Sequence, residues 1–252
     1  MSDKKSIAVT GAGAGIGRAV LMHFFGLGWR VAGLDKDGEA LAELRAALPE
    51  ALLVEADVGD EAAAESAFAD IAKWLGDDPL TALVNNAGLA DPYCGPLEDL
   101  ALADWQAWID ASLTAAFLCS RAALPLLRRR EGSSIVNISS TRALMSEPDT
   151  FAYAAAKGGL DAFTHAMAVS LGPDIRVNSI RPGWIETGPW QKASRREEPK
   201  HSKKDREQHP VGRVGKPEDV AGAVEWLVSA GFMTGQAIAV DGGMTVRMIY
   251  AE

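Results

Sequence analysis

Cysteine is scarce in this chain, which has only Cys94 and Cys119 among its 252 residues. Two cysteines are too few for a framework of disulfides, so we expect both to be free thiols in a reducing compartment. Neither has a nearby cysteine or histidine at the spacing of a metal site. We therefore predict that the protein binds no metal.

Long apolar segments and an excess of positive charge are also lacking. No apolar run is long enough to cross a bilayer, and the first residues lead into a strand rather than a signal peptide. We expect a cytoplasmic protein without a membrane partner. Lys and Arg number 25 against 34 Asp and Glu, a formal net charge of -9. This balance argues against nucleic acid as a partner.

The chain does contain enough apolar residues to build one large core. Hydrophobic residues make up 48% and charged residues 23%, which is typical of a globular protein. A chain of 252 residues fits one large α/β domain.

A glycine-rich turn, residues 11–17, follows a short apolar strand at residues 7–10 and precedes an amphipathic helix over about 16–27. Glycines let the backbone approach a pyrophosphate, and the start of a helix offers free amide groups. The alternative is a flexible turn without a ligand. The order of strand, turn and helix favours a dinucleotide site.

Asp35 ends the second predicted strand, residues 29–34, about 20 residues beyond the glycines. An acid at this place binds the ribose hydroxyls of NAD and repels the additional phosphate of NADP. Lys36 could pair with that phosphate, but a neighbouring lysine does not cancel the aspartate. We predict that the cofactor is NAD.

The pattern of strand and helix then continues, with helices at about 38–48 and 61–75 and strands at 52–56 and 80–84. This alternation predicts a doubly wound parallel sheet. Asp57, at the end of the third strand, either binds the adenine amino group or caps the following turn. The tetrapeptide at 85–88, Asn-Asn-Ala-Gly, suits a tight turn after the fourth strand.

Tyr153 and Lys157 are four residues apart in an alanine-rich segment. If the segment is helical, both side chains lie on one face, one turn apart. An ammonium beside a phenol stabilises the phenolate, so the phenol could exchange a proton with a substrate oxygen. Ser140 ends a buried strand at 135–138, where open α/β sheets bind their ligands. Alone, this tyrosine and lysine pair could equally be an ordinary exposed pair.

Taken together, the motifs resemble the short-chain dehydrogenase/reductase family in its single-domain form. The resemblance implies a Rossmann-type doubly wound parallel sheet of about seven strands, with helices on both faces, over residues 1–252. It extends over almost the whole chain and rests on Thr10-Gly11-x-x-x-Gly15-x-Gly17, Asn85-Asn86-Ala87-Gly88, Ser140, Tyr153-x-x-x-Lys157 and Pro182-Gly183-x-Ile185-x-Thr187.

The resemblance implies roles for these residues. Tyr153 would be the general acid/base, Ser140 would polarise the substrate oxygen, and Lys157 would bind the nicotinamide ribose and activate the tyrosine. Ile185 and Thr187 would hold the nicotinamide carboxamide. Asn86 would contact the adenosine side or steady the central strands. The residues expected at the cofactor are Thr10, Gly11, Gly15, Ile16, Gly17, Asp35, Asp57, Val58, Asn86, Ala87, Gly88, Tyr153, Lys157, Pro182, Gly183, Ile185 and Thr187.

The chain departs from the family at Ser112, which stands where members usually have an asparagine that completes a proton relay. Serine is shorter and presents no carboxamide oxygen. We expect Ser112 to support the relay in a weaker form, through one additional water.

The segment 187–212 changes abruptly to charged and polar residues, which predicts a lid over the substrate or a solvated insertion. The residues expected to line the substrate pocket are Tyr93, Leu144, Met145, Trp184 and Trp190, which favour an apolar, uncharged substrate of modest size. Arg142 is either a carboxylate ligand or a solvent-facing side chain.

The broad apolar faces of the segment 101–130 and of the helix carrying Tyr153 indicate a homo-oligomer, a dimer or tetramer. The apolar chain end, 246–250, is expected to dock on the body or on a neighbouring subunit.

These features favour an NAD-dependent oxidoreductase that interconverts a small secondary alcohol and a ketone. An NADP-dependent ketoreductase of the 3-oxoacyl type and a non-catalytic dinucleotide-binding regulator are the alternatives.

Overall fold

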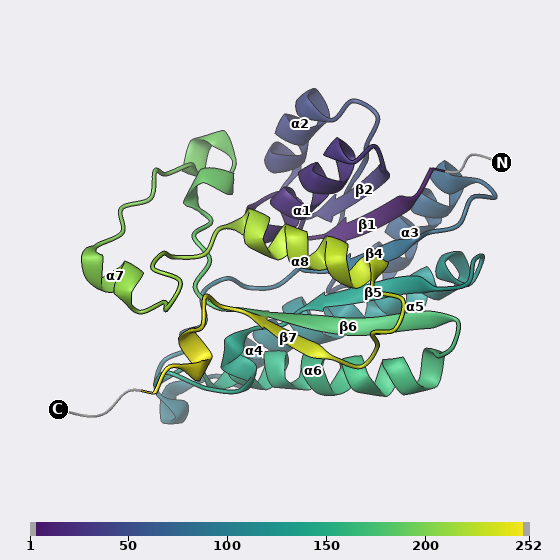
Figure 1. Cartoon of the computed structure of the whole chain (residues 1–252). Coiled ribbons are helices and arrows are strands. Elements are labelled where there is room, and N and C mark those ends of the chain that lie inside the picture. The colour runs from purple at the N-terminus through teal and green to yellow at the C-terminus, as the bar shows by residue number, and fades with distance from the viewer. Residues whose placement is uncertain (1–3, 249–252) are drawn as a thin grey trace.

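One sheet of seven parallel strands runs through the molecule, in the order β3-β2-β1-β4-β5-β6-β7 (Figure 1). The structure, a computed structural model, describes residues 4–248. The strands are β1 (Ser6–Thr10), β2 (Arg30–Asp35), β3 (Leu52–Glu55), β4 (Ala82–Asn85), β5 (Ser133–Ile138), β6 (Ile175–Pro182) and β7 (Ala237–Val240). The predicted fold class and the seven strands are thereby confirmed.

Central strands are buried along their whole length because helices cover both faces of the sheet. Every residue of β1, β4 and β5 is buried. Each contains a short apolar run in its middle, at 7–9, 82–84 and 135–136, and these runs made the strands predictable.

One layer of helices covers each face of the sheet (Figure 1). The first layer consists of α1 (Gly15–Gly26), α2 (Gly38–Ala47) and α8 (Pro217–Ser229). The second layer consists of α3 (Glu61–Leu75), α5 (Ala115–Leu127) and α6 (Phe151–Leu171). Cys119 lies in the second core, where burial raises the pKa of its thiol to about 12 and so keeps it protonated.

The strand order reverses between β1 and β4, because the chain returns to the other side of β1 after β3. Ligands of open α/β sheets bind at the carboxyl ends of the strands beside such a reversal. The loops that leave β1, β4, β5 and β6 all lie at this edge, as does α7 (Lys203–Glu207), to the left in Figure 1. The fold thus brings the sequence motifs to one edge.

The helical stretch Leu102–Leu127 consists of α4 (Leu102–Ile109), a π-helical turn (Asp110–Thr114) and α5. By length and composition alone it could cross a membrane, contrary to the expectation that no apolar run is long enough. In the structure 44% of its apolar window is buried inside the protein, and core helices commonly pass the same test. The stretch is weak support for a membrane span.

The end of the chain lies only partly within the described residues. Val246 and Met248 are exposed. The remainder of the predicted docking segment, Ile249 and Tyr250, lies outside the described range.

Candidate active site

The backbone of the glycine-rich turn between β1 and α1 packs so closely on itself that it leaves no room for a side chain at Gly17. At Gly17 a Cβ atom would come within 2.0 Å of the Gly11 carbonyl oxygen, so no other residue fits. The turn leads directly into α1, whose first amide groups face outward from the helix start. A close backbone turn at a helix N-terminus is suited to a pyrophosphate.

Asp35 crosses from the end of β2 to this turn. Its Oδ2 accepts a hydrogen bond from the Gly13 amide (2.7 Å), and its Oδ1 accepts one from the Asp37 amide (2.9 Å). Both bonds fix the carboxylate beside the glycines. Lys36 turns away and lies 3.9 Å from the Asp57 carboxylate, with both side chains largely exposed.

The Asp57 side chain caps a turn, whereas the Val58 side chain packs in the core. The Asp57 carboxylate accepts a hydrogen bond from the Gly59 amide (3.1 Å), as expected for the capping alternative. Val58 is buried in the core between the sheet and α3. Any contact of Val58 with a ligand would therefore come from its backbone.

The turn after β4 is tied to the end of β1. The Thr10 hydroxyl accepts hydrogen bonds from the amides of Asn86 and Ala87, both at 3.0 Å. In return, the Asn86 amide group donates to the carbonyls of Thr10 (3.0 Å) and Gly11 (3.1 Å). Thr10 is buried, so its hydroxyl joins two strands, and Asn86 takes the steadying position that was one of its two expected roles.

Tyr153 and Lys157 lie one turn apart on α6, with the lysine Nζ 5.7 Å from the centre of the tyrosine ring. Lys157 is buried, and its ammonium donates to the carbonyl of Ile138 at the end of β5 (2.9 Å). The Ser139 hydroxyl donates to the Lys157 carbonyl (3.0 Å). These bonds fix α6 against the strand end that leads into Ser140, which is itself buried and accepts from the Arg142 amide (3.1 Å).

Ser112 lies in the π-helical turn, and its hydroxyl, like the Lys157 ammonium, lies near Gly88. Its hydroxyl is buried and has no hydrogen-bond partner among residues 4–248. A Cβ added at Gly88 would lie 2.9 Å from Ser112 Oγ and 3.5 Å from Lys157 Nζ. The missing side chain of Gly88 therefore lets the serine hydroxyl and the lysine ammonium both lie close to this turn.

The segment after β6 reaches back to the glycine turn. Gly183 binds the end of β7 through its amide, which donates to the Val240 carbonyl (3.0 Å). Ile185 pairs with Gly215 in a single parallel bridge. A Cβ at Gly15 would meet the Thr187 methyl group at 3.3 Å. The structure therefore brings Thr187 against the glycine turn.

A strap, residues 191–196, then lies against α2 and is held there mainly by ion pairs. Lys192 lies 2.7 Å from both Asp37 and Glu39. Its ammonium holds the pKa of Asp37 below the ordinary value, and the two carboxylates raise the pKa of Lys192. Further along, the Ala193 amide donates to Glu43 (2.7 Å) and lowers the pKa of that carboxyl.

The remainder of the segment 187–212 folds over Trp184. The Trp184 ring makes an edge contact with His201 at 5.8 Å and a tilted contact with His209 at 6.2 Å. His201 also lies 3.0 Å from the Glu186 carboxylate. A capping box formed by Ser202 and Asp205 starts α7. The segment is thus ordered by contacts at both ends.

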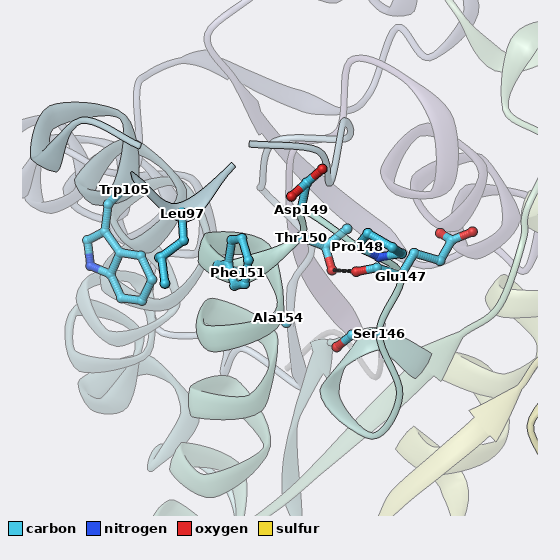
Figure 2. A pocket seen from close by; sticks show the side chains of 9 residues that line it. All are labelled: Leu97, Trp105, Ser146, Glu147, Pro148, Asp149, Thr150, Phe151 and Ala154. Atoms are coloured by element: carbon cyan, nitrogen blue, oxygen red, sulfur yellow. Dashed lines mark hydrogen bonds between the residues drawn. The ribbon is translucent and has the colours of Figure 1, made fainter. Parts of the chain in front are cut away.

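The cavity beside the start of α6 is built by other residues than those expected for the substrate. It holds about 500 Å³, and Figure 2 shows Trp105, Leu97 and Phe151 forming one apolar side, while the Glu147 carboxylate points away from them. None of the five predicted substrate residues lines it. A second cavity of about 650 Å³ lies at the opposite edge of the sheet, near Lys5 and Trp29.

The five predicted substrate residues stand in exposed or half-buried loops at the carboxyl edge. Exposed among them are Tyr93, Leu144, Met145 and Trp184. Trp190 belongs to a short 3-10 helix, Gly188–Trp190, that begins the segment 187–212. The Tyr93 hydroxyl donates to the Glu147 carboxylate (3.2 Å) on the loop that follows Ser140.

The sequence carries no local signal for the residues that join distant segments here. Glu147 receives bonds from Tyr93 and from Arg142, and Asp37 and Glu39 hold the strap through Lys192. Asp37 and Lys192 are far apart in the sequence, so no local spacing indicates that they pair. No group of three or more potential metal ligands occurs within residues 4–248.

Comparison with known proteins gives similarity along nearly the whole chain. A family model described as Enoyl-(Acyl carrier protein) reductase matches residues 11–245. An uncharacterized oxidoreductase of Thermotoga maritima is 43% identical over 260 residues, which cover 100% of both chains. The 2-(S)-hydroxypropyl-CoM dehydrogenase 3 of Xanthobacter autotrophicus is 39% identical over 95% of this chain and 96% of its own. An apo SCOR enzyme from Clostridium thermocellum matches with a TM-score of 0.87 and 35% identity, over 99% of this chain and 96% of that one.

Proposed function

The chain belongs to the short-chain dehydrogenase/reductase family of oxidoreductases, and from this membership we propose that it is an NAD-dependent enzyme that interconverts a secondary alcohol and a ketone. The observation that carries the proposal is the position of Lys157. Its ammonium is fixed to the end of β5 and lies 5.7 Å from the Tyr153 ring, beside the strand end that leads to Ser140.

Members of this family use nicotinamide cofactors, and the residues at the carboxyl edge fit one. The glycine turn suits a pyrophosphate because its backbone packs closely at the start of α1, where a side chain at Gly17 would overlap the Gly11 carbonyl and where the first helical amides have no partner within the helix. When bound, the nicotinamide supplies the hydride acceptor or donor. The fixed carboxylate of Asp35 would accept hydrogen bonds from the ribose hydroxyls of NAD and repel the additional phosphate of NADP.

The chain's own residues would then handle the proton. Tyr153 would take the proton from the alcohol hydroxyl, or return it to the ketone oxygen, as general base and acid. Ser140 would hold that oxygen by a hydrogen bond, and the Lys157 ammonium would stabilise the phenolate. Because NAD mostly accepts hydride in cells, we propose oxidation of the alcohol as the usual direction.

We also propose that the segment 187–212 closes over the bound ligands as a lid. The strap lies on α2, the helix that begins just after Asp35, so a cofactor bound beside Asp35 would lie close to it. The Trp184 contacts with His201 and His209 support the other end of the segment. A closed lid would exclude water from the reacting groups.

The relative from Xanthobacter autotrophicus is named as a dehydrogenase of a hydroxypropyl compound, which accords with an alcohol as substrate for this chain. A non-catalytic regulator is less well supported, because Ser140, Tyr153 and Lys157 are all present, and Lys157 lies beside the Tyr153 ring and binds the strand end that leads to Ser140.

A panel of secondary alcohols with NAD, and separately with NADP, tests the proposal through the absorbance of the reduced cofactor. Oxidation of at least one alcohol, faster with NAD, is expected. Absence of turnover with every alcohol and every corresponding ketone would contradict it.

A further inference from the structure

Three polar side chains gather from the two loops that leave the neighbouring strands β4 and β5. We call Tyr93, Arg142 and Glu147 the mouth cluster. The Tyr93 hydroxyl donates to Glu147 (3.2 Å), the Arg142 guanidinium pairs with the same carboxylate, and that guanidinium lies 5.7 Å from the Tyr93 ring centre. Neither the glycine turn nor the pair of Tyr153 and Lys157 uses any of these groups.

The mouth cluster is held close to the reacting groups. The Arg142 amide donates to the Ser140 hydroxyl (3.1 Å), so the arginine begins two residues from the proposed substrate contact. Two bonds from Cys94, through its amide (2.8 Å) and its thiol (3.2 Å) to the Asp149 carbonyl, fasten the Tyr93 loop to the Glu147 loop. A substrate bound at Ser140 would therefore lie beside the loop that carries Arg142 and Glu147.

The guanidinium has hydrogen-bonding capacity left over. The Arg142 side chain is 26% exposed, and its Nε is buried without a hydrogen-bond partner among the described residues. A buried donor without an acceptor is unfavourable, so an oxygen of a ligand at this place would be stabilising. Tyr93 is 52% exposed, so its ring can turn aside as a ligand enters. The Glu147 side chain is 56% exposed, so its carboxylate is open to that ligand.

The charge of Glu147 decides which kind of oxygen fits. An unpaired arginine would attract a carboxylate, sulfonate or phosphate. Here Glu147 already neutralises the guanidinium, and an approaching anion would meet its negative charge. An uncharged hydroxyl can accept from the guanidinium and donate to the carboxylate, and a carbonyl oxygen can accept from the guanidinium, in each case without bringing a second negative charge beside Glu147.

We propose that the mouth cluster selects uncharged substrates that carry a second oxygen, such as vicinal diols and hydroxyketones, over both simple and anionic alcohols. The inference rests on the proposed alcohol oxidation and names the substrate class for the same site. The two earlier possibilities for Arg142, a carboxylate ligand or a solvent-facing side chain, are both replaced by a donor to a neutral oxygen.

Three alcohols of equal carbon number test this selection with the full-length enzyme: 2,3-butanediol, 2-butanol and 3-hydroxybutyrate. We expect kcat/KM with NAD to be at least about tenfold higher for the diol than for either of the others. Arg142→Met should lower kcat/KM for the diol by about tenfold and leave 2-butanol within about threefold. Arg121→Met is the matched control, because Arg121 pairs with Glu61 and Glu65 on the outer face of α5.

Glu147→Gln provides the opposite test, since it keeps the shape of the side chain and removes its charge. The freed guanidinium should raise kcat/KM for 3-hydroxybutyrate by at least about tenfold relative to the diol. Equal use of diol and 2-butanol by the unmutated enzyme, or an unchanged ratio in Glu147→Gln, would overturn the inference.

Failure of the inference can be told from failure of the proposed function. If other secondary alcohols are oxidised while 2,3-butanediol neither reacts nor inhibits, the mouth cluster does not select diols and the proposed function stands. If no alcohol is oxidised with NAD or NADP, both are wrong.

Discussion

Replacing Gly88 by alanine tests the packing between the turn after β4, Ser112 and Lys157. The added Cβ would lie 2.9 Å from Ser112 Oγ, which is closer than real Cβ contacts come, and 3.5 Å from Lys157 Nζ, which is an ordinary contact. Ser112 is 2% exposed, so its hydroxyl has little room to move away. We expect Gly88→Ala to lower the free energy of unfolding by about 1–3 kcal/mol, the usual range for overpacking.

Ser112→Ala, unlike Gly88→Ala, should not lower the free energy of unfolding. Its buried hydroxyl has no partner among residues 4–248, so its removal should leave the free energy of unfolding unchanged or raise it by about 1 kcal/mol. In Ser112→Ala the catalytic rate should fall only a few-fold, equivalent to less than about 1.4 kcal/mol, because the serine contributes little to a proton relay that is already weak. In the double variant the clash is gone, so Gly88→Ala should then be tolerated to within about 0.5 kcal/mol.

Urea unfolding of the two single variants and the double variant, at one protein concentration, measures this coupling. Steady-state rates of the same proteins at two pH values report on the relay. Equal destabilisation by Gly88→Ala with and without the serine hydroxyl would refute the packing argument. A 100-fold or greater loss of rate in Ser112→Ala would show that the serine is essential and that the relay is not weakened.

Two further predictions concern the cofactor and the lid. For the unmutated enzyme, kcat/KM with NAD should exceed that with NADP by at least about tenfold, or 1.4 kcal/mol. Asp35→Ala should reduce this ratio of the two kcat/KM values. Equal use of both cofactors by the unmutated enzyme would contradict selection of NAD by Asp35. NADH should slow tryptic cleavage within 187–212, and Lys192→Met should speed this cleavage several-fold, since it releases the strap from α2. Lys203→Met is the control: it also removes one trypsin site but breaks only an exposed ion pair in α7, so it should not speed the cleavage. Equal cleavage rates in the two variants would show that Lys192 does not hold the strap.

The fold was largely predictable because its signals are local. The strands that pack between two helix layers read as short apolar runs, and the predicted helix at 61–75 agrees with α3 (Glu61–Leu75), where the Asp60 side chain caps the first turn. The helix that carries Tyr153 and Lys157 was likewise indicated by four-residue spacing and alanine content. Short-range chemistry was sufficient for these elements.

The contacts between distant segments were not predictable, since they depend on how the layers pack. Nothing near Lys192 in the sequence indicates that it meets Asp37, and nothing near Tyr93 indicates Glu147. The π-helical turn that places Ser112 beside Gly88 also has no clear sequence signal. These residues determine how the segment 187–212 and the loops after β4 and β5 pack, and the sequence alone does not indicate those contacts.

The central claim is that Tyr153 transfers the proton in a hydride-transfer enzyme, and Tyr153→Phe tests it most directly. The substitution keeps the ring beside Lys157 and removes only the hydroxyl. We predict that kcat with the best alcohol of the panel falls by about 100-fold or more, while the affinity for NADH, measured by its fluorescence, stays within about threefold. Near-normal turnover in this variant, with the fold intact by circular dichroism, would contradict the account.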